Sequence, residues 1–238
     1  GAAIAASQKQ AAFSEKAVAD EKAAAVVDVL LGYSAGIVAT IGSESGAQTR
    51  MANLVALTNV AYQASGVTMR VRLVHSMLVN YSDTGFKNDA TLRKLTGYDE
   101  TTQQSIPVDP AFTALRAARE QYGADLVALV RQYREPEQDG CGIAWLIGMN
   151  QRAISPATDA GFGYAVVGDG TDLDESDSRT YKCSQYALAH ELGHLMGQAQ
   201  NTEDSAGRSG AHTYSYGYRE AASTGFFNIS CASSGTHT

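Results

Sequence analysis

Apolar residues along the chain gather in short runs that are typical of buried strands. Four such runs predict strands at 26–33, 123–130, 142–147 and 163–167. Residues 68–75 alternate between apolar and polar side chains, which predicts a strand with one polar face that ends at His75. A lone histidine near a strand end is more often a partly buried polar group than a metal ligand, and we interpret His75 in that way.

Segments that are predicted to be helical lie between these strands. Apolar residues recur at helical spacing from 48 to 64, after a Gly/Ser-containing loop at 42–46, and Ser65-Gly66 closes that helix. Asp109-Pro110 begins a second helix that runs to Tyr122. The order of elements is strand, helix, strand, helix, three strands and a last helix, which predicts an α/β fold with one mostly parallel sheet under helices.

The first 25 residues differ from the rest in composition. Residues 1–25 are rich in Ala, Lys, Gln and Glu, and we interpret them as a lead-in or propeptide remnant. Residues 26–238 contain no internal repeat and no linker, which predicts a single domain. The chain begins with Gly1 and has no charged n-region, so it reads as the cut end of a longer precursor in which a removed signal peptide is not visible.

Composition and charge narrow the classes of partner. The apolar fraction of 44% over 238 residues is sufficient for a hydrophobic core. The formal net charge is -7, and lysines and arginines are scattered, which argues against a nucleic-acid partner. We find no apolar run long enough to span a membrane. The oligomeric state is not predictable from these features.

The segment His190-Glu191-Leu192-Gly193-His194 carries the candidate chemistry. Histidines at this spacing lie on one face of a helix, so both imidazoles can bind one zinc ion, and Glu191 is placed to act as general base for a bound water. In the long zincin signature, a glycine at the position of Gly197 turns the chain back toward the metal. This glycine favours a metal site over two unrelated histidines on an exposed helix. Ser184 is a candidate N-cap for the helix.

The predicted third ligand departs from the zincin signature. The pattern H-E-x-x-H-x-x-G-x-x-H requires a histidine where this chain has Gln200. A glutamine oxygen is neutral and is not one of the usual zinc ligands, but we take Gln200 as the candidate third ligand. Glu203, Asp204 and His212 are alternatives, although a solvated acidic loop and a surface histidine are the favoured interpretations of these residues.

The cysteines and one acidic segment leave alternatives open. Cys141, Cys183 and Cys231 form no C-x-x-C pair, so a cysteine zinc site is not expected. One disulfide with one remaining thiol fits a secreted protein, and three reduced, buried cysteines are the alternative. The acidic residues 169–177 are interpreted as a solvated loop, although their oxygens would also suit calcium.

From about residue 26 to its C-terminus, the chain resembles the bacterial reprolysin-like members of the metzincin zinc endopeptidases. The resemblance is carried by the segments 27–33, 59–73, 141–145, 183–194 and 214–219. It implies a zincin fold in which a mixed, mostly parallel sheet has an antiparallel edge strand and is flanked by helices that include the zinc-binding helix. It also implies a secreted, zinc-dependent enzyme that hydrolyses peptide bonds in protein or peptide substrates, which lie along the edge strand at 142–146.

Three departures from the family pattern support a rival interpretation. Gln200 replaces the third histidine, Ser230 occupies the methionine position of the Met-turn, and the chain stops at Thr238, before the family's C-terminal helix, as a truncated, variant or degenerating member would. The rival is a catalytically impaired pseudoprotease that binds peptide or weak zinc. The intact pair of His190 and Glu191 favours an active enzyme.

The resemblance also suggests one disulfide. Cys141 opens the expected edge strand and Cys183 precedes the expected zinc helix, so both lie beside the expected active-site cleft. We therefore expect these two cysteines to be bonded, with Cys231 as the unpaired thiol. Such a bond would stabilise the fold by about 3–4 kcal/mol because it constrains the unfolded chain.

Overall fold

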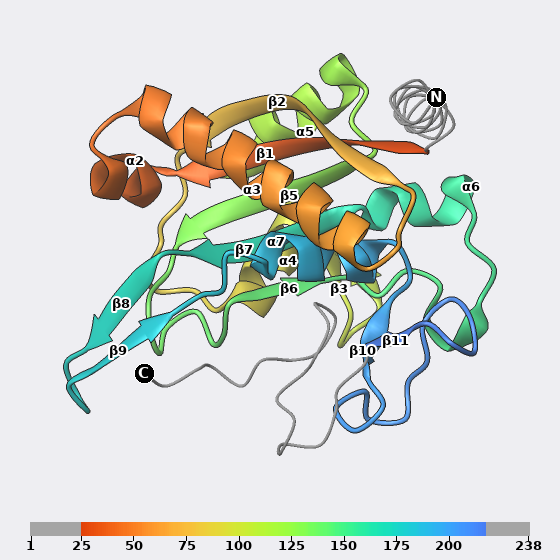
Figure 1. Ribbon diagram of the computed structural model, residues 1–238. Helices are drawn as coiled ribbons and strands as arrows, with labels where there is room; N and C mark the ends of the chain where they lie inside the picture. Colours follow the sequence, from red (N-terminus) through yellow and green to blue (C-terminus); the bar gives the residue numbers. More distant parts are fainter. Residues whose placement is uncertain (1–24, 218–238) are drawn as a thin grey trace, which may run out of the picture.

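A five-stranded sheet forms the centre of the protein, for which the computed structural model describes residues 25–217 (Figure 1). The strands are, in spatial order, β2 (Arg70–Val79), β1 (Val26–Ser34), β5 (Leu126–Gln132), β7 (Tyr164–Asp169) and β6 (Gly142–Ala144). Neighbouring strands run parallel except β6, which lies antiparallel to β7 at the edge. The predicted mixed, mostly parallel sheet with an antiparallel edge strand is confirmed.

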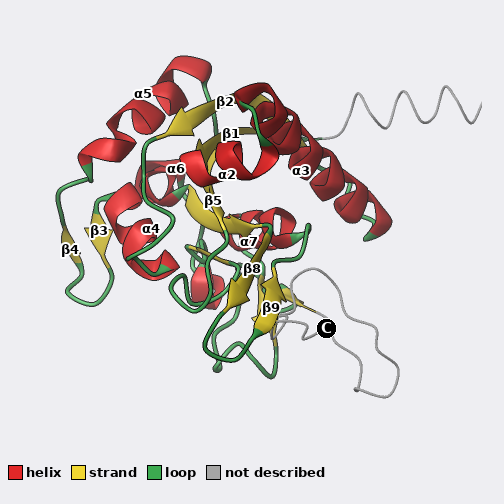
Figure 2. Cartoon of the chain, turned by 90° about the vertical axis from the view of Figure 1, so that its left-hand side faces the viewer, coloured by secondary structure: helices red, strands yellow, loops and turns green. Residues whose placement is uncertain are grey.

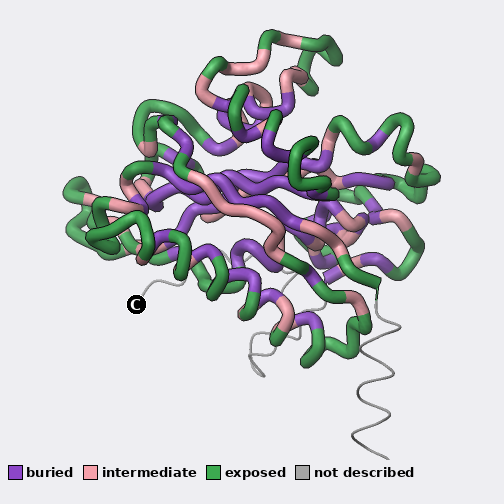
Figure 3. The backbone as a smooth tube through the Cα atoms, turned by 90° about the horizontal axis from the view of Figure 1, so that it is seen from above, coloured by how far each residue is buried: buried purple, intermediate pink, exposed green. Residues whose placement is uncertain are grey.

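Helices cover both faces of this sheet. One face carries α2 (Ala35–Ile41), α3 (Glu44–Ala64) and α7 (Ala187–Leu195), and the other carries α4 (Asn88–Thr96) and α5 (Thr113–Tyr122). Figure 2 shows α4 and α5 on one side of the strands and α3 on the other. The strands between them are largely buried (Figure 3), as expected for a parallel sheet covered by helices.

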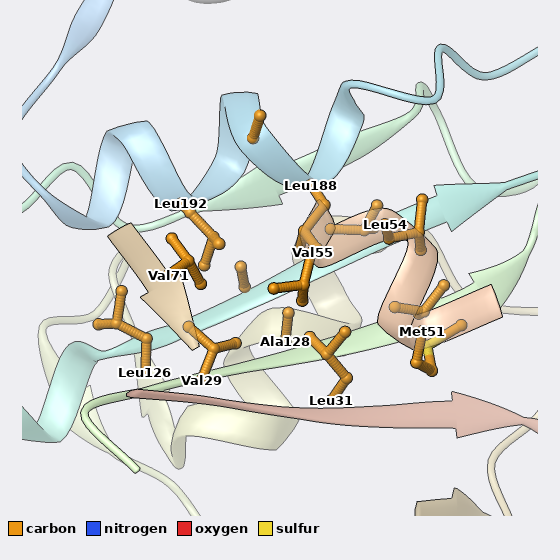
Figure 4. Close-up of a cluster of buried hydrophobic side chains, with 14 of the residues drawn as sticks. Val29, Leu31, Met51, Leu54, Val55, Val71, Leu126, Ala128, Leu188 and Leu192 are labelled. Carbon is orange, nitrogen blue, oxygen red and sulfur yellow. The ribbon is translucent and has the colours of Figure 1, made fainter. Parts of the chain in front are cut away.

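The two faces are built from alternating residues of the same strands. Val29 and Leu31 of β1 pack in the cluster that includes α3 and α7, whereas Leu30 packs in the cluster that includes α5. In the first cluster, Leu188 and Leu192 of α7 lie over the sheet beside α3 (Figure 4). Helix α7 is therefore held against the sheet by its apolar face.

Small elements complete the described chain. They are α6 (Pro156–Asp159), three 3₁₀ turns (Pro110–Phe112, Met149–Gln151 and Ala160–Phe162), and three two-stranded ribbons: β3 (Tyr98–Asp99) with β4 (Gln104–Ser105), β8 (Thr171–Asp174) with β9 (Arg179–Lys182), and β10 (Ala199–Asn201) with β11 (Tyr216–Gly217). No helix within residues 25–217 has both the length and the apolar character needed to cross a membrane.

Several sequence predictions need correction. The predicted loop at 42–46 is only a two-residue break, because Ser43 accepts a hydrogen bond from the Gly46 N–H and starts α3 at Glu44. The helix α4 lies in a polar stretch for which no helix was predicted. Ser184 is not the N-cap of α7: its hydroxyl accepts from the Tyr186 N–H one turn earlier, and Tyr186 occupies the cap position.

The acidic segment 169–177 is mostly exposed to solvent, as expected, but much of it belongs to a β-hairpin and not to an irregular loop. Asp169 pairs with Arg50 of α3, with an Oδ1–Nη2 distance of 2.6 Å, and Asp172 pairs with Arg134 at 2.8 Å. The strands β8 and β9 pair antiparallel, and most of their residues and the turn between them remain exposed to solvent. The predicted lead-in, Ser230 and Cys231 lie in 1–24 and 218–238, outside the described residues.

Candidate metal centre

Helix α7 brings its two histidines together on one face. The rings of His190 and His194 lie 4.5 Å apart between centroids, and their Nε2 atoms are 3.0 Å apart. The helix ends at Leu195, and Gly197 then adopts a left-handed conformation with φ of 89°. A Cβ at Gly197 would lie 2.6 Å from the Ala211 Cβ, so both the backbone angle and the available space require glycine there.

A backbone carbonyl fixes the tautomer of His194. The Nδ1 atom lies 2.6 Å from the Gln198 carbonyl oxygen, which can only accept a hydrogen bond. The proton of the neutral ring therefore resides on Nδ1, and the lone pair of Nε2 faces the site. Burial, together with the nearby His190, lowers the pKa of His194 to about 4, so the ring is neutral at physiological pH.

The turn at Gly197 leads into β10, which carries Gln200 to the two histidines. The Gln200 amide nitrogen lies 3.2 Å from His190 Nε2 and 3.0 Å from His194 Nε2, while its Oε1 atom is buried without a hydrogen-bond partner. The oxygen and nitrogen of an amide are assigned from their contacts, and a half-turn of the amide would point the oxygen at the two imidazole nitrogens.

The other candidate ligands do not join this cluster, although Asp204 lines the cavity beside His194 and Gln200. Among residues 25–217, the histidine, cysteine and acidic ligand atoms that gather within 4.8 Å belong to His190, Glu191 and His194. Glu203 accepts a hydrogen bond from Asn201, and His212 stacks on Tyr214. His75, in β2, stacks on Tyr122 with a centroid distance of 4.0 Å, in keeping with a partly buried polar group.

Glu191 is a buried carboxyl with one oxygen left without a partner. The residue is 4% exposed, and Oε2 makes no hydrogen bond among the described residues. Burial raises the pKa of Glu191 to about 8 because no positive charge compensates for the lost solvation. Buried carboxyls without compensation are uncommon in protein cores and are concentrated at functional sites.

These residues fit a metal ion. Ligands at about 2.0–2.1 Å around a tetrahedral zinc are about 3.3 Å from one another, close to the 3.0–3.2 Å that separates the Gln200 and histidine atoms. The unpartnered Glu191 Oε2 atom points to the same conclusion, since a water beside a bound ion would supply its missing contact, and Gln200 would face the ion with its oxygen after a half-turn of its amide. Two imidazoles and an amide bind zinc more weakly than three imidazoles do.

A cavity of about 240 Å³ opens beside the histidines. Its wall includes Ala144 and Leu146 from the edge strand and the segment that follows it, together with His194 and Gln200. Two charged residues, Asp204 and Arg208, also line it. A cavity between an edge strand and a candidate metal site is the expected position for a substrate side chain.

The predicted disulfide is confirmed. Cys141 and Cys183 are bonded, with their Cα atoms 5.3 Å apart. The bond connects the start of β6 with the segment that leads into α7. It thereby links the edge strand to the helix that carries Glu191.

Two contributors to this site were not predicted from the sequence. Arg208 lines the cavity, and Gly142 lies against the Glu191 carboxyl, where a Cβ would be 2.6 Å from Oε1. Neither belongs to a local motif, because each meets the site only through tertiary folding. Gly142 directly follows Cys141 in the expected edge strand, and that position is the one available signal.

Comparisons with known proteins agree with this geometry. Residues 23–237 match the model of the metallopeptidase family M12B, reprolysin-like. The peptidyl-Asp metalloendopeptidase of Pseudomonas aeruginosa is 28% identical over 223 residues, which cover 85% of this chain and 31% of that protein, so the chain spans about a third of that relative's length. A solved structure described as a chaperone–substrate complex shares the fold, with a TM-score of 0.58 and 21% identity, over 88% of this chain and 31% of that one. The family match covers nearly the whole chain and includes the histidine pair, and the chain therefore belongs to the M12B reprolysin-like metallopeptidases.

Proposed function

We propose that this chain is a zinc-dependent endopeptidase in which His190, His194 and Gln200 hold the metal and Glu191 is the general base. The observation that carries the proposal is the unpartnered, buried Glu191 carboxyl beside the two converging histidine Nε2 atoms. The family implies a metal and peptide or protein substrates. Imidazole ligands and the H-E-x-x-H spacing favour zinc.

The reaction follows from the positions of the side chains. Zinc held by His190, His194 and Gln200 would supply Lewis-acid activation of the scissile carbonyl and of a water molecule. Glu191 would accept a proton from the attacking water and pass it to the leaving amine nitrogen. The Gln198 carbonyl keeps His194 in the tautomer whose Nε2 can bind the ion. The surrounding apolar packing of α7 limits the access of bulk water to Glu191.

The edge strand offers a binding site for the substrate backbone. Strand β6 pairs with β7 on one side only and lies at the end of the sheet order. An extended peptide that adds to this edge would gain main-chain hydrogen bonds with little dependence on sequence. Side-chain selection would then come from the adjoining cavity.

We propose that this cavity favours an acidic side chain. Arg208 is the positively charged residue among those that line it, and the P. aeruginosa relative is named for action at aspartyl residues. Asp204 lies in the same wall and would select a basic side chain if it dominated. Peptides that differ only in having Asp, Asn or Lys beside the scissile bond distinguish selection by Arg208 from selection by Asp204. We expect the Asp peptide to have about tenfold higher kcat/KM than the Asn peptide, and Arg208→Ala to remove the difference.

Arg72→Ala is the control for this test, because Arg72 pairs with Asp28 at the opposite edge of the sheet. It should leave the preference unchanged. Faster cleavage of the Lys peptide would contradict the assignment to Arg208.

Gln200 favours the rival proposal of a non-catalytic protein, since its amide is a weak zinc ligand. Hydrolysis of an unfolded protein substrate, with and without a chelator, separates the two. An active enzyme loses hydrolysis on chelation and regains it with zinc, whereas a pseudoprotease cleaves nothing in any arm. We also propose that the chain acts outside the cytoplasm, where the disulfide between Cys141 and Cys183 would persist.

A further inference from the structure

The start of the edge strand lies in direct contact with the Glu191 side chain. A Cβ built on Gly142 would be 2.6 Å from Glu191 Oε1, 2.8 Å from its Cγ and 2.9 Å from its Cδ. Real Cβ atoms essentially never approach other heavy atoms within 3.0 Å. The Gly142 backbone therefore forms a wall of the space that holds the Glu191 carboxyl, and any side chain at 142 would occupy that space.

The backbone angles at Gly142 do not explain the glycine. Gly142 is not among the glycines with positive φ, so an alanine could adopt its conformation. Gly197 differs in this respect, because its φ of 89° alone disfavours other residues. What distinguishes Gly142 is the side chain that it faces.

Neither the backbone at Gly142 nor helix α7 can move away from this contact. The segment at 142 is held by the disulfide of Cys141 with Cys183, by the hydrogen bond from the Gly168 N–H to the Cys141 carbonyl at 2.8 Å, and by pairing with Val167. On the other side, α7 is fixed by Leu188 and Leu192, which are fully buried. An added methyl group would therefore displace the softest element, which is the Glu191 carboxyl.

We propose that Gly142 is a positioning residue for Glu191: the absence of a Cβ at 142 leaves the space in which the carboxyl lies, and the disulfide maintains that wall. The inference rests on the proposed function, in which Glu191 is the base. A base must lie within hydrogen-bond reach of the proton that it abstracts, and small displacements from that position reduce the rate of the chemical step.

The first test separates positioning from substrate binding and from metal binding. Gly142→Ala should lower kcat by at least about tenfold with KM within about twofold, at unchanged zinc content and intact disulfide. Gly161→Ala is the matched control, since Gly161 has no atom within 4 Å of a built Cβ and no positive φ. A crystal structure of metal-free Gly142→Ala should show the Glu191 carboxyl displaced.

The second test does not depend on catalysis, and so distinguishes failure of this inference from failure of the proposed function. Any loss of thermal stability caused by Gly142→Ala should be smaller in a Glu191→Ala background, because the atoms that meet the methyl are then absent. If the wild-type chain hydrolyses nothing, the proposed function fails, and the position of Glu191 in the variant still decides the inference. An undisplaced Glu191 carboxyl together with an unchanged kcat, or an equal stability loss in both backgrounds, would overturn it.

Discussion

Two buried ionisable side chains in this protein have opposite surroundings. At the C-terminal end of α5, the Arg119 guanidinium donates to three backbone carbonyls, those of Ala124, Asp125 and Ala160, at 3.2, 2.6 and 2.7 Å. In α7, the Glu191 carboxyl is buried as deeply and keeps one oxygen without a partner. A buried polar group with satisfied hydrogen bonds cross-links the fold, whereas one with an unsatisfied atom costs stability and is expected where a ligand or reaction supplies the missing contact.

The largest effect on activity should follow from removal of the Glu191 carboxyl, which has an unpartnered oxygen. Glu191→Gln keeps the shape of the side chain but removes the base, so we expect kcat to fall by about 100- to 10,000-fold. The free energy of unfolding of the metal-free protein should not decrease, since a buried carboxyl without compensation is replaced by a neutral amide. Zinc content should stay the same. Substantial residual hydrolysis would show that Glu191 is not the base.

Removal of the Arg119 guanidinium should lower stability and leave activity unchanged. Arg119→Met leaves the three carbonyls without their donor, which should lower the free energy of unfolding by about 2–4 kcal/mol. Below the melting temperature, kcat should remain near the wild-type value. Denaturant unfolding and steady-state kinetics on one preparation provide both numbers. A large loss of activity without a loss of stability would break the distinction between the two sites.

A stronger third ligand at position 200 should complete the metal site beside Glu191. Gln200→His replaces a buried amide by an imidazole on a turn that already leads to His190 and His194. We expect zinc affinity to rise by at least tenfold, about 1.4 kcal/mol, in competition with a chromophoric chelator. Asn201→His, at the neighbouring position, is the control and should not produce this gain. Unchanged affinity in Gln200→His would mean that position 200 does not contact the metal.

A smaller effect, on the pH dependence of stability, is expected at Asp83. Its carboxyl accepts from the Gln132 N–H at 3.1 Å, and burial raises its pKa despite the nearby Ser34 hydroxyl and Arg131 charge. The folded state thus holds this proton more tightly than the unfolded state. The resulting stabilisation is present below the ordinary aspartate pKa of about 3.9 and is lost as the pH rises through the raised value. Asp83→Asn should flatten the dependence of urea midpoints on pH over that range; identical profiles would contradict the assignment.

The comparison also shows what the sequence could and could not predict. The strands β1, β5 and β7 were predictable because strands buried on both faces read as continuous apolar runs, and the histidine pair because helical spacing is local. The contact of Gly142 with Glu191 and the place of Arg208 were not predictable, since they depend on how distant segments meet. The hairpin of β8 and β9 was not predicted, because its strands are short, polar and exposed and lack the apolar pattern that marks a buried strand.

We propose that the buried Glu191 carboxyl and the converging histidines form a zinc-dependent catalytic site. The most direct measurement is a zinc titration of the chelated protein, with hydrolysis of an unfolded protein followed at each point. We expect activity to be lost on chelation, to return in proportion to added zinc and to reach a plateau at about one ion per chain, while Glu191→Gln binds the same zinc and stays inactive. Hydrolysis that is unaffected by chelation, or one bound zinc per chain with no hydrolysis, would contradict it.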